Sequence, residues 1–327
     1  NTYKLTIGAT GASNNVLRIL TGGSVTNGGT VQVGSAGAGV SNSLIMGGGC
    51  LSASSLSLPV VSNGVTFNSG WMNLRTATVN NGLPFTVGDG ASVATLTATD
   101  SAGTLTFNNG LVIAKNSWLL GIGMVSGAVT IQDGGTAAGS GRLLSATEVQ
   151  SGGLLTGTLT ADNATVKAGG IVEPGTDGYG TLSAGNLTME DGGILRFAVV
   201  SNSVLQVNGE FRTTVTGSNI VRVVTVPPPG TYVLVRYNDT IWGGGFPVLT
   251  LSPLPHGVTG TLIHNNGGID KSVDLNVAVG SSAFVTWTGA KSAFWDIDAT
   301  TNWLYMGSPC TYLNGDFTRF DDTPAWN

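Results

Sequence analysis

Few residues of this sequence belong to the types that carry out acid–base or metal chemistry. Its 327 residues include 18 Asp and Glu, 13 Lys and Arg, two His and two Cys. Hydrolysis of a glycosidic bond needs two carboxyl groups that face that bond, and polysaccharide lyases need an acidic metal cluster with a base beside it. Asp89, Asp133 and Asp191 are turn residues of a repeat, and the other acids before residue 197 do not recur at one repeat position. We therefore expect no catalytic residues, no cofactor and no enzyme activity.

Tryptophans near the C-terminus form a second group of candidates. Trp287, Trp295 and Trp303 are spaced by eight residues, and Trp326 follows them. Aromatic rings can stack on sugar rings, and at strand spacing they more often pack into a core. Both interpretations stay open here: a carbohydrate or assembly contact, and an aromatic core.

Possible metal ligands are two histidines, His256 and His264, and a group of aspartates in the last segment. The aspartates could bind calcium, but their spacing fits no EF-hand loop, and turn geometry accounts for them. We expect no metal site. The aspartates concerned are Asp296, Asp298, Asp316, Asp321 and Asp322.

Cys50 and Cys310 lie far apart in the sequence and belong to no metal-binding or redox motif. Two isolated buried thiols are the simplest interpretation. Because Cys50 falls in an early coil of the repeat described next, we expect no intrachain bond to Cys310. An assembly contact could still join Cys50 of one copy to Cys310 of another.

The elements that must position these residues follow an internal repeat. A short strand ends in Asn-Gly, Asp-Gly or Gly-Gly and is followed at once by another apolar strand, about every 20 residues. Apolar and polar residues alternate before each turn, which indicates half-buried strands. Examples are TNGGTVQV (26–33), FNSGWMNL (67–74), FNNGLVIA (107–114) and MEDGGILRF (189–197). The threonines expected in register are Thr66, Thr86, Thr106, Thr130 and Thr188.

Two architectures fit such a repeat. Asn-Gly between strands is a strong hairpin signal, so an antiparallel meander is one possibility. A meander would show an equivalent turn after every strand, whereas one strong turn per 20 residues favours a right-handed parallel β-helix, a solenoid of stacked coils. We predict an all-β chain with this helix over 1–197, wider coils or a sandwich-like cap over 198–280, and a Trp-rich β unit over 281–327.

The composition narrows the class further. Charged residues make up 9% of the chain, Gly accounts for 51 residues, and the mean hydropathy is +0.24. Disorder requires more charge and fewer apolar residues. With a net charge of −5 and no basic stripe we expect no nucleic-acid partner, and without 18 consecutive apolar residues we expect no membrane span. A Cys-poor chain rich in Gly, Ser, Thr and Asn is typical of bacterial surface proteins, so we expect an extracellular or cell-surface location.

Three ordered stretches resemble signatures of the bacterial autotransporter-associated β-strand repeat proteins. TWTGAKSAFWDIDATTNW (286–303) with NGDFTRFDDT (314–323) resembles the opening of a repeat unit, and residues 230–277 resemble its closing segment. GGIVEPGTDGYGTLSAGNLTMEDGGILRF (169–197) is similar to the family's penultimate coils. The resemblance implies a secreted or surface-attached passenger-like β-helix without catalytic residues. Because an opening signature stands last, we expect a processed chain or one segment of a longer protein.

These observations predict a structural protein, a rod-shaped subunit of a bacterial surface fibre that assembles end to end. Unpaired strands at the ends of a coil stack template association, and head-to-tail contacts that do not close build filaments. The first strand, TYKLTIG (2–8), carries a single charge, Lys4. The expected partners are copies of the chain or adjacent segments of a longer one. The alternatives are an adhesin that binds polysaccharide through the Trp-rich end or a rod face and, less favoured, a polysaccharide-degrading enzyme.

Overall fold

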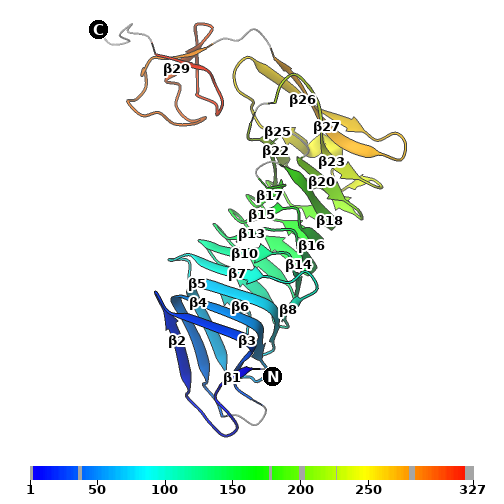
Figure 1. Cartoon of the computed structure of the whole chain (residues 1–327). Coiled ribbons are helices and arrows are strands. Elements are labelled where there is room, and N and C mark those ends of the chain that lie inside the picture. The colour runs from blue at the N-terminus through cyan, green and yellow to red at the C-terminus, as the bar shows by residue number, and fades with distance from the viewer. Residues whose placement is uncertain are drawn as a thin grey trace.

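A computed structural model shows an elongated all-β molecule (Figure 1). It describes residues 3–35, 39–176, 179–198, 203–225, 227–279 and 284–320. Strands account for 57% of the chain, arranged as one sheet of 27 mostly parallel strands and a separate sheet of four. The only helical turn within the described residues is the short 3-10 element η1 (Phe246–Val248), and no helix there is long and apolar enough to cross a membrane.

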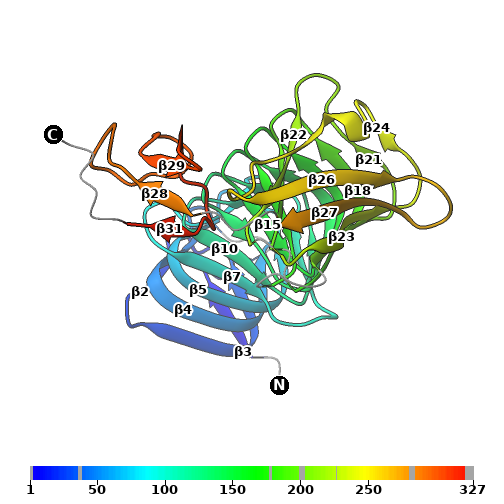
Figure 2. The same ribbon diagram turned by 90° about the horizontal axis from the view of Figure 1, so that it is seen from above.

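The large sheet winds into three faces, because each coil contributes a strand to each of three parallel ladders. β4 (Ser43–Leu58) and β5 (Gly64–Val79) are long enough to pass through all three ladders in succession. Viewed from above, successive coils lie over one another (Figure 2). We call the ladders faces A, B and C.

Face A begins with β3 and ends with β25. Its strands are β3 (Ser24–Val33), β4, β5, β7 (Ala94–Ala98), β10 (Ser117–Gly121), β13 (Thr136–Ala137), β15 (Leu154–Gly157), β17 (Ile171–Pro174), β19 (Ile194–Phe197), β22 (Asn219–Val223) and β25 (Leu249–Leu251).

Face B begins with β1 and ends with β23. Its strands are β1 (Lys4–Ile7), β3, β4, β5, β8 (Thr104–Phe107), β11 (Met124–Ser126), β14 (Arg142–Val149), β16 (Thr160–Val166), β18 (Gly180–Met189), β20 (Ser203–Val207) and β23 (Gly230–Tyr237).

Face C begins with β2 and ends with β24. Its strands are β2 (Val16–Leu20), β4, β5, β6 (Phe85–Val87), β9 (Leu111–Ile113), β12 (Val129–Ile131), β14, β16, β18, β21 (Phe211–Arg212) and β24 (Ile241–Trp242).

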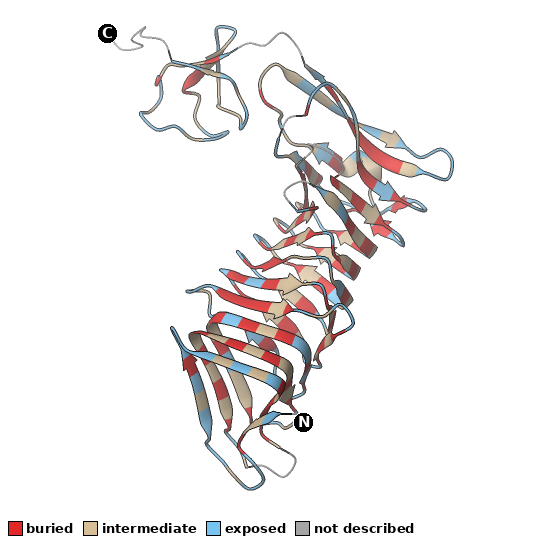
Figure 3. Ribbon diagram, viewed as in Figure 1, coloured by how far each residue is buried: buried red, intermediate tan, exposed pale blue. Residues whose placement is uncertain are grey.

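The core lies inside the three faces and consists of like residues stacked in register. Strand alternation sends every second side chain inward, which Figure 3 shows as alternating buried and exposed segments. On face C the inward column is aliphatic or aromatic over nine coils, and every member is buried. Its members are Ile19, Met46, Phe67, Val87, Ile113, Ile131, Val149, Val166 and Met189.

Buried asparagines stack at one corner of the early coils. The backbone N–H of Asn42 donates to Oδ1 of Asn63 at 2.8 Å, and Nδ2 of Asn81 donates to the carbonyl of Asn63 at 3.0 Å. All three residues are buried. Because buried backbone groups need partners, these side-chain amides supply partners for the backbone N–H of Asn42 and the carbonyl of Asn63.

Glycines fill another corner, where successive coils approach too closely for a side chain. Gly121, Gly139 and Gly157 have φ values of 134°, 126° and 94°. A Cβ on Gly139 would lie 2.1 Å from the carbonyl oxygen of Gly121. Only glycine fits this backbone and this spacing.

The all-β class and the mostly parallel sheet predicted from the sequence are confirmed, and the antiparallel meander is wrong for this region. The repeat length is less regular than expected: Leu154 pairs with Ile171, whereas Ile220 pairs with Thr250. Thr106 does not join the other threonines, because it pairs with Thr78 on face B. The same turn motif serves more than one corner, so its spacing does not mark one coil position.

Parallel coils continue beyond residue 197 as far as β25, so wider coils occupy much of the segment 198–280. The hairpin β26 (Val258–Asn265) and β27 (Lys271–Val279) then runs antiparallel along β23. The four-stranded sheet follows, built from β28 (Val285–Trp287), β29 (Trp303–Tyr305), β30 (Ser308–Cys310) and β31 (Thr318–Arg319). Trp326, Asp321 and Asp322 lie outside the described residues.

Candidate functional site

The three predicted tryptophans come together in the four-stranded sheet, with Trp303 buried at their centre. The ring centroid of Trp287 lies 4.9 Å from that of Trp303 at an interplanar angle of 74°, and that of Trp295 lies 5.2 Å away at 66°. These are edge-to-face contacts of the kind found in aromatic cores. Trp295 remains 53% exposed, and because the rings are inclined to one another the three tryptophans do not form one coplanar surface.

Asn302 fixes the loop that carries Trp295, a role that sequence reasoning did not assign. Its buried Oδ1 accepts hydrogen bonds from the backbone N–H groups of Lys291 and Ser292, at 2.8 and 2.9 Å. Its Nδ2 donates to the carbonyl of Phe294 at 2.9 Å. A fully bonded buried amide of this kind rigidifies its surroundings. In the sequence, the only feature that could have pointed to this role is the position of Asn302 directly before Trp303.

A buried carboxylate joins the four-stranded sheet to the coil stack. The side chain of Asp316 has no exposed surface and lies 2.9 Å from Nδ1 of His256. Its oxygens also accept the backbone N–H groups of His256 and Leu313, both at 2.7 Å. The His256 ring packs against Tyr305, with centroids 4.7 Å apart. His256 and Asp316, two of the candidate metal ligands, therefore form a structural link between the coil stack and the C-terminal sheet.

A cavity of about 750 Å³ lies between the last coils of face A and the four-stranded sheet. Arg196, Arg222 and Ser252 border it from the coils, and Asp298 and Asn314 border it from the sheet. Arg196 is engaged by Glu173 on the neighbouring coil. Asp298 is the single carboxylate among the described lining residues, whereas glycoside hydrolysis needs two.

The two cysteines are free and far apart in the fold. Cys50 lies on β4 in an early coil, and Cys310 lies on β30, and each is half-buried. Burial, together with the nearby charge of Asp316, raises the pKa of the Cys310 thiol. A raised pKa lowers the thiolate fraction, so Cys310 is a poor nucleophile at neutral pH.

The remaining metal candidates do not converge. Asp296 accepts the backbone N–H of Thr300 at 2.7 Å, and Asp298 accepts the hydroxyl of Thr311 at 3.2 Å. His264 lies on the hairpin, where its Nε2 is 2.6 Å from the hydroxyl of Tyr237. Over the part of the chain that the structure describes, no three His, Cys, Asp or Glu side chains are placed to hold a metal ion.

Strands at the ends of the stack have unpaired edges. β1 pairs only with β3, and β2 pairs only with β4, so their other edges meet no strand of the described chain. At the far end β27 covers β23, while β24 and β25 each pair on one side only. Lys4 and Arg18 supply the charges of the two first strands.

No known protein-family model matches this chain, and no curated protein matches it either.

Proposed function

We propose that this chain is a structural, non-enzymatic rod of a bacterial surface protein, related to the autotransporter-associated β-strand repeat family. It acts outside the cell and associates end to end through strands of its terminal coils, with copies of itself or with adjacent segments of a longer chain. We assign a right-handed winding, because connections between parallel strands of one sheet are right-handed in nearly all proteins.

The observation that carries this proposal is the pair of open strand edges at the first coil. β1 and β2 leave a row of backbone N–H and C=O groups without partners in the described chain. Such edges template the addition of another strand unless charge, proline or a covering element blocks them. β24 and β25 are only two and three residues long, so the first coil offers the longer contact.

The placement of charged residues supports a structural role as well. Many charges of the coils form ion pairs between adjacent coils, on the outer surface and away from one common site. The pairs are Arg75–Asp100, Arg142–Asp162, Lys167–Glu190 and Arg196–Glu173. Exposed pairs of this kind contribute little stability each, and each of these acids has its charge balanced by a base on an adjacent coil.

A substitution in β2 separates edge pairing from other contacts. The Ser43 N–H donates to the carbonyl of Asn15, so the backbone groups of Asn15 face β4. In a parallel strand the backbone groups of successive residues point to opposite sides. Residue 17 therefore also faces β4, and the N–H of Arg18 points to the open edge. Arg18→Pro removes that donor, whereas Arg18→Ala removes only the charge. Sedimentation under reducing conditions should show concentration-dependent association of the native chain and of Arg18→Ala, and loss of association in Arg18→Pro. A native chain that stays monomeric at every concentration contradicts the proposal.

A further inference from the structure

Two tryptophans outside the C-terminal segment lie in one column on the outer side of face A. Trp71 on β5 pairs in register with Thr95 on β7, and Thr95 pairs with Trp118 on β10. The indoles therefore lie two coils apart along the rod axis, about 9.5 Å at the usual strand spacing. They are 54% and 40% exposed, although tryptophan is normally largely buried.

We infer from the burial of neighbouring threonines that both indoles lie along the sheet surface. Thr95 is on the outer side of face A between the two tryptophans, yet it is only 6% exposed. Thr136, the next residue of the column after Trp118, is 7% exposed. Outward threonines on an open sheet become covered in this way when neighbouring large rings lie over them. The opposite ring faces are then left toward solvent.

Hydrogen-bonding side chains run beside the tryptophans in the adjacent outward column. Ser52, Asn73 and Thr97 are in register on three successive coils, two positions along from the tryptophan column. All three are half-exposed, and none bonds to another described side chain. Hydroxyl and amide groups beside a ring face are what a sugar requires, since its C–H face stacks on the ring and its hydroxyls need partners at the rim.

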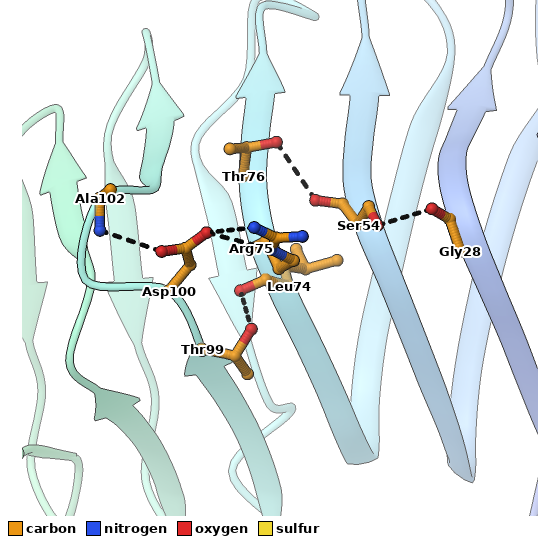
Figure 4. A network of polar contacts seen from close by, with 8 residues as sticks. All are labelled: Gly28, Ser54, Leu74, Arg75, Thr76, Thr99, Asp100 and Ala102. Carbon is orange, nitrogen blue, oxygen red and sulfur yellow. Dashed lines mark hydrogen bonds and ion pairs between the residues drawn. The ribbon is translucent and has the colours of Figure 1, made fainter. Parts of the chain in front are cut away.

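Charged residues border this surface at both corners. Asp89, Lys115 and Asp133 are exposed at the corner that precedes face A, and Arg75 and Asp100 form an ion pair at the corner that follows it. At the corner that follows Asn73 on β5, Nε and Nη2 of Arg75 donate to Asp100 at 3.0 and 2.7 Å. Figure 4 shows this pair within a chain of corner contacts that includes Thr99, whose hydroxyl donates to the Leu74 carbonyl. On the three coils that carry Trp71, Thr95 and Trp118 neither column holds a charged residue, so the surface suits an uncharged ligand.

We propose that face A binds an uncharged, extended β-1,4-linked glycan, which lies along the rod axis across Trp71 and Trp118. In such a glycan successive sugars are turned over, so every second ring presents the same face, at a repeat close to two coil steps. Ser52, Asn73 and Thr97 bond the hydroxyls at the chain's edge. This binding is independent of end-to-end association, so either proposal can fail while the other holds.

The test uses the full chain with cellohexaose, mannohexaose and chitohexaose as probes, and maltohexaose as the α-linked control, measured by titration calorimetry. At least one β-1,4-linked probe should bind, and maltohexaose should not. Trp71→Ala and Trp118→Ala should each weaken binding tenfold or more, and Trp71→Phe should retain most of it. Trp242→Ala is the matched control, because Trp242 is 48% exposed on face C and should leave binding unchanged.

Thermal unfolding of each variant separates lost binding from lost folding. The proposal is overturned if none of the three β-linked probes binds, if maltohexaose binds equally well, or if Trp242→Ala weakens binding as much as Trp71→Ala. It is also overturned if folded Trp71→Ala binds normally or if its only effect is to abolish association between copies. The last result would make face A a contact between protein chains.

Discussion

The imidazole Nδ1 of His256 lies 2.9 Å from Oδ2 of Asp316, which is 60 residues further along the chain. His256 lies between β25 and the hairpin β26–β27, and Asp316 lies in the loop between β30 and β31, so this contact joins loops of two sheets that share no ladder. The carboxylate also accepts two backbone N–H groups. Because its carboxylate is buried and makes these three contacts, Asp316 is the main polar anchor of the C-terminal sheet.

Removal of that anchor should weaken the contact between the sheets. Asp316→Ala leaves the backbone N–H groups of His256 and Leu313 without their acceptor, and a buried donor without a partner costs about 1–3 kcal/mol. The free energy of unfolding of the C-terminal sheet, measured by tryptophan fluorescence in urea, should fall by that order. Asp298→Asn is the control, because Asp298 is exposed and should cost less than about 0.5 kcal/mol. Equal effects of the two variants would contradict the anchor.

The asparagine corner should be important for the stability of the early coils. Asn63→Ala leaves the buried backbone N–H of Asn42 without its 2.8 Å partner, which costs about 1–3 kcal/mol. Asn73→Ala changes an amide on the outer surface and should have little effect on equilibrium unfolding. A stability loss at Asn63 no larger than that at Asn73 would show that the corner amides are dispensable.

Gly139→Ala should destabilise the stack more than an ordinary glycine substitution. The added Cβ would lie 2.1 Å from the carbonyl oxygen of Gly121, and the alanine would have to adopt the φ of 126° that Gly139 has. Strain and overpacking together should cost more than about 2 kcal/mol. At Gly64 a Cβ would meet no atom within 4 Å and φ is not positive, so Gly64→Ala should change the free energy of unfolding by less than about 0.5 kcal/mol.

His264 should make the hairpin region sensitive to acid. Burial lowers the pKa of His264 below its ordinary value of 6.5, and the ring stacks on Phe246 with centroids 4.7 Å apart. A histidine that is harder to protonate when folded takes up protons on unfolding. Its contribution to stability is complete above pH 6.5 and is lost as pH falls through and below that value.

Unfolding measured between pH 8 and pH 5 should therefore show stability falling on the acid side, and His264→Phe should flatten this dependence while keeping the ring stack. A pH profile that His264→Phe leaves unchanged would assign the acid sensitivity to other groups.

Local patterns predicted the strands well, because alternation and turn residues act over a few positions. The inward columns follow from that alternation, and Phe67 above Met46 is an example. Coil lengths could not be predicted, because Thr106 and Thr130 follow the same sequence pattern but lie on different faces. The contact of His256 with Asp316 left no local signal, since it depends on how the two sheets dock. The column of Trp71 and Trp118 became visible only once the register of the coils was known.

The most direct test of the account is a disulfide between adjacent coils, since every proposal above depends on parallel stacking in register. Thr165 on β16 pairs with Thr188 on β18, and both point outward. The background chain carries Cys50→Ser and Cys310→Ser, so that the two natural thiols cannot react. In this background, Thr165→Cys with Thr188→Cys should form an intramolecular disulfide under mild oxidation, because neighbouring parallel strands lie within disulfide reach. Mass spectrometry of the linked peptides detects the bond. The shifted pair Thr165→Cys with Asn186→Cys should not form one. A bond in the shifted pair, or none in the registered pair, would contradict the stacked architecture.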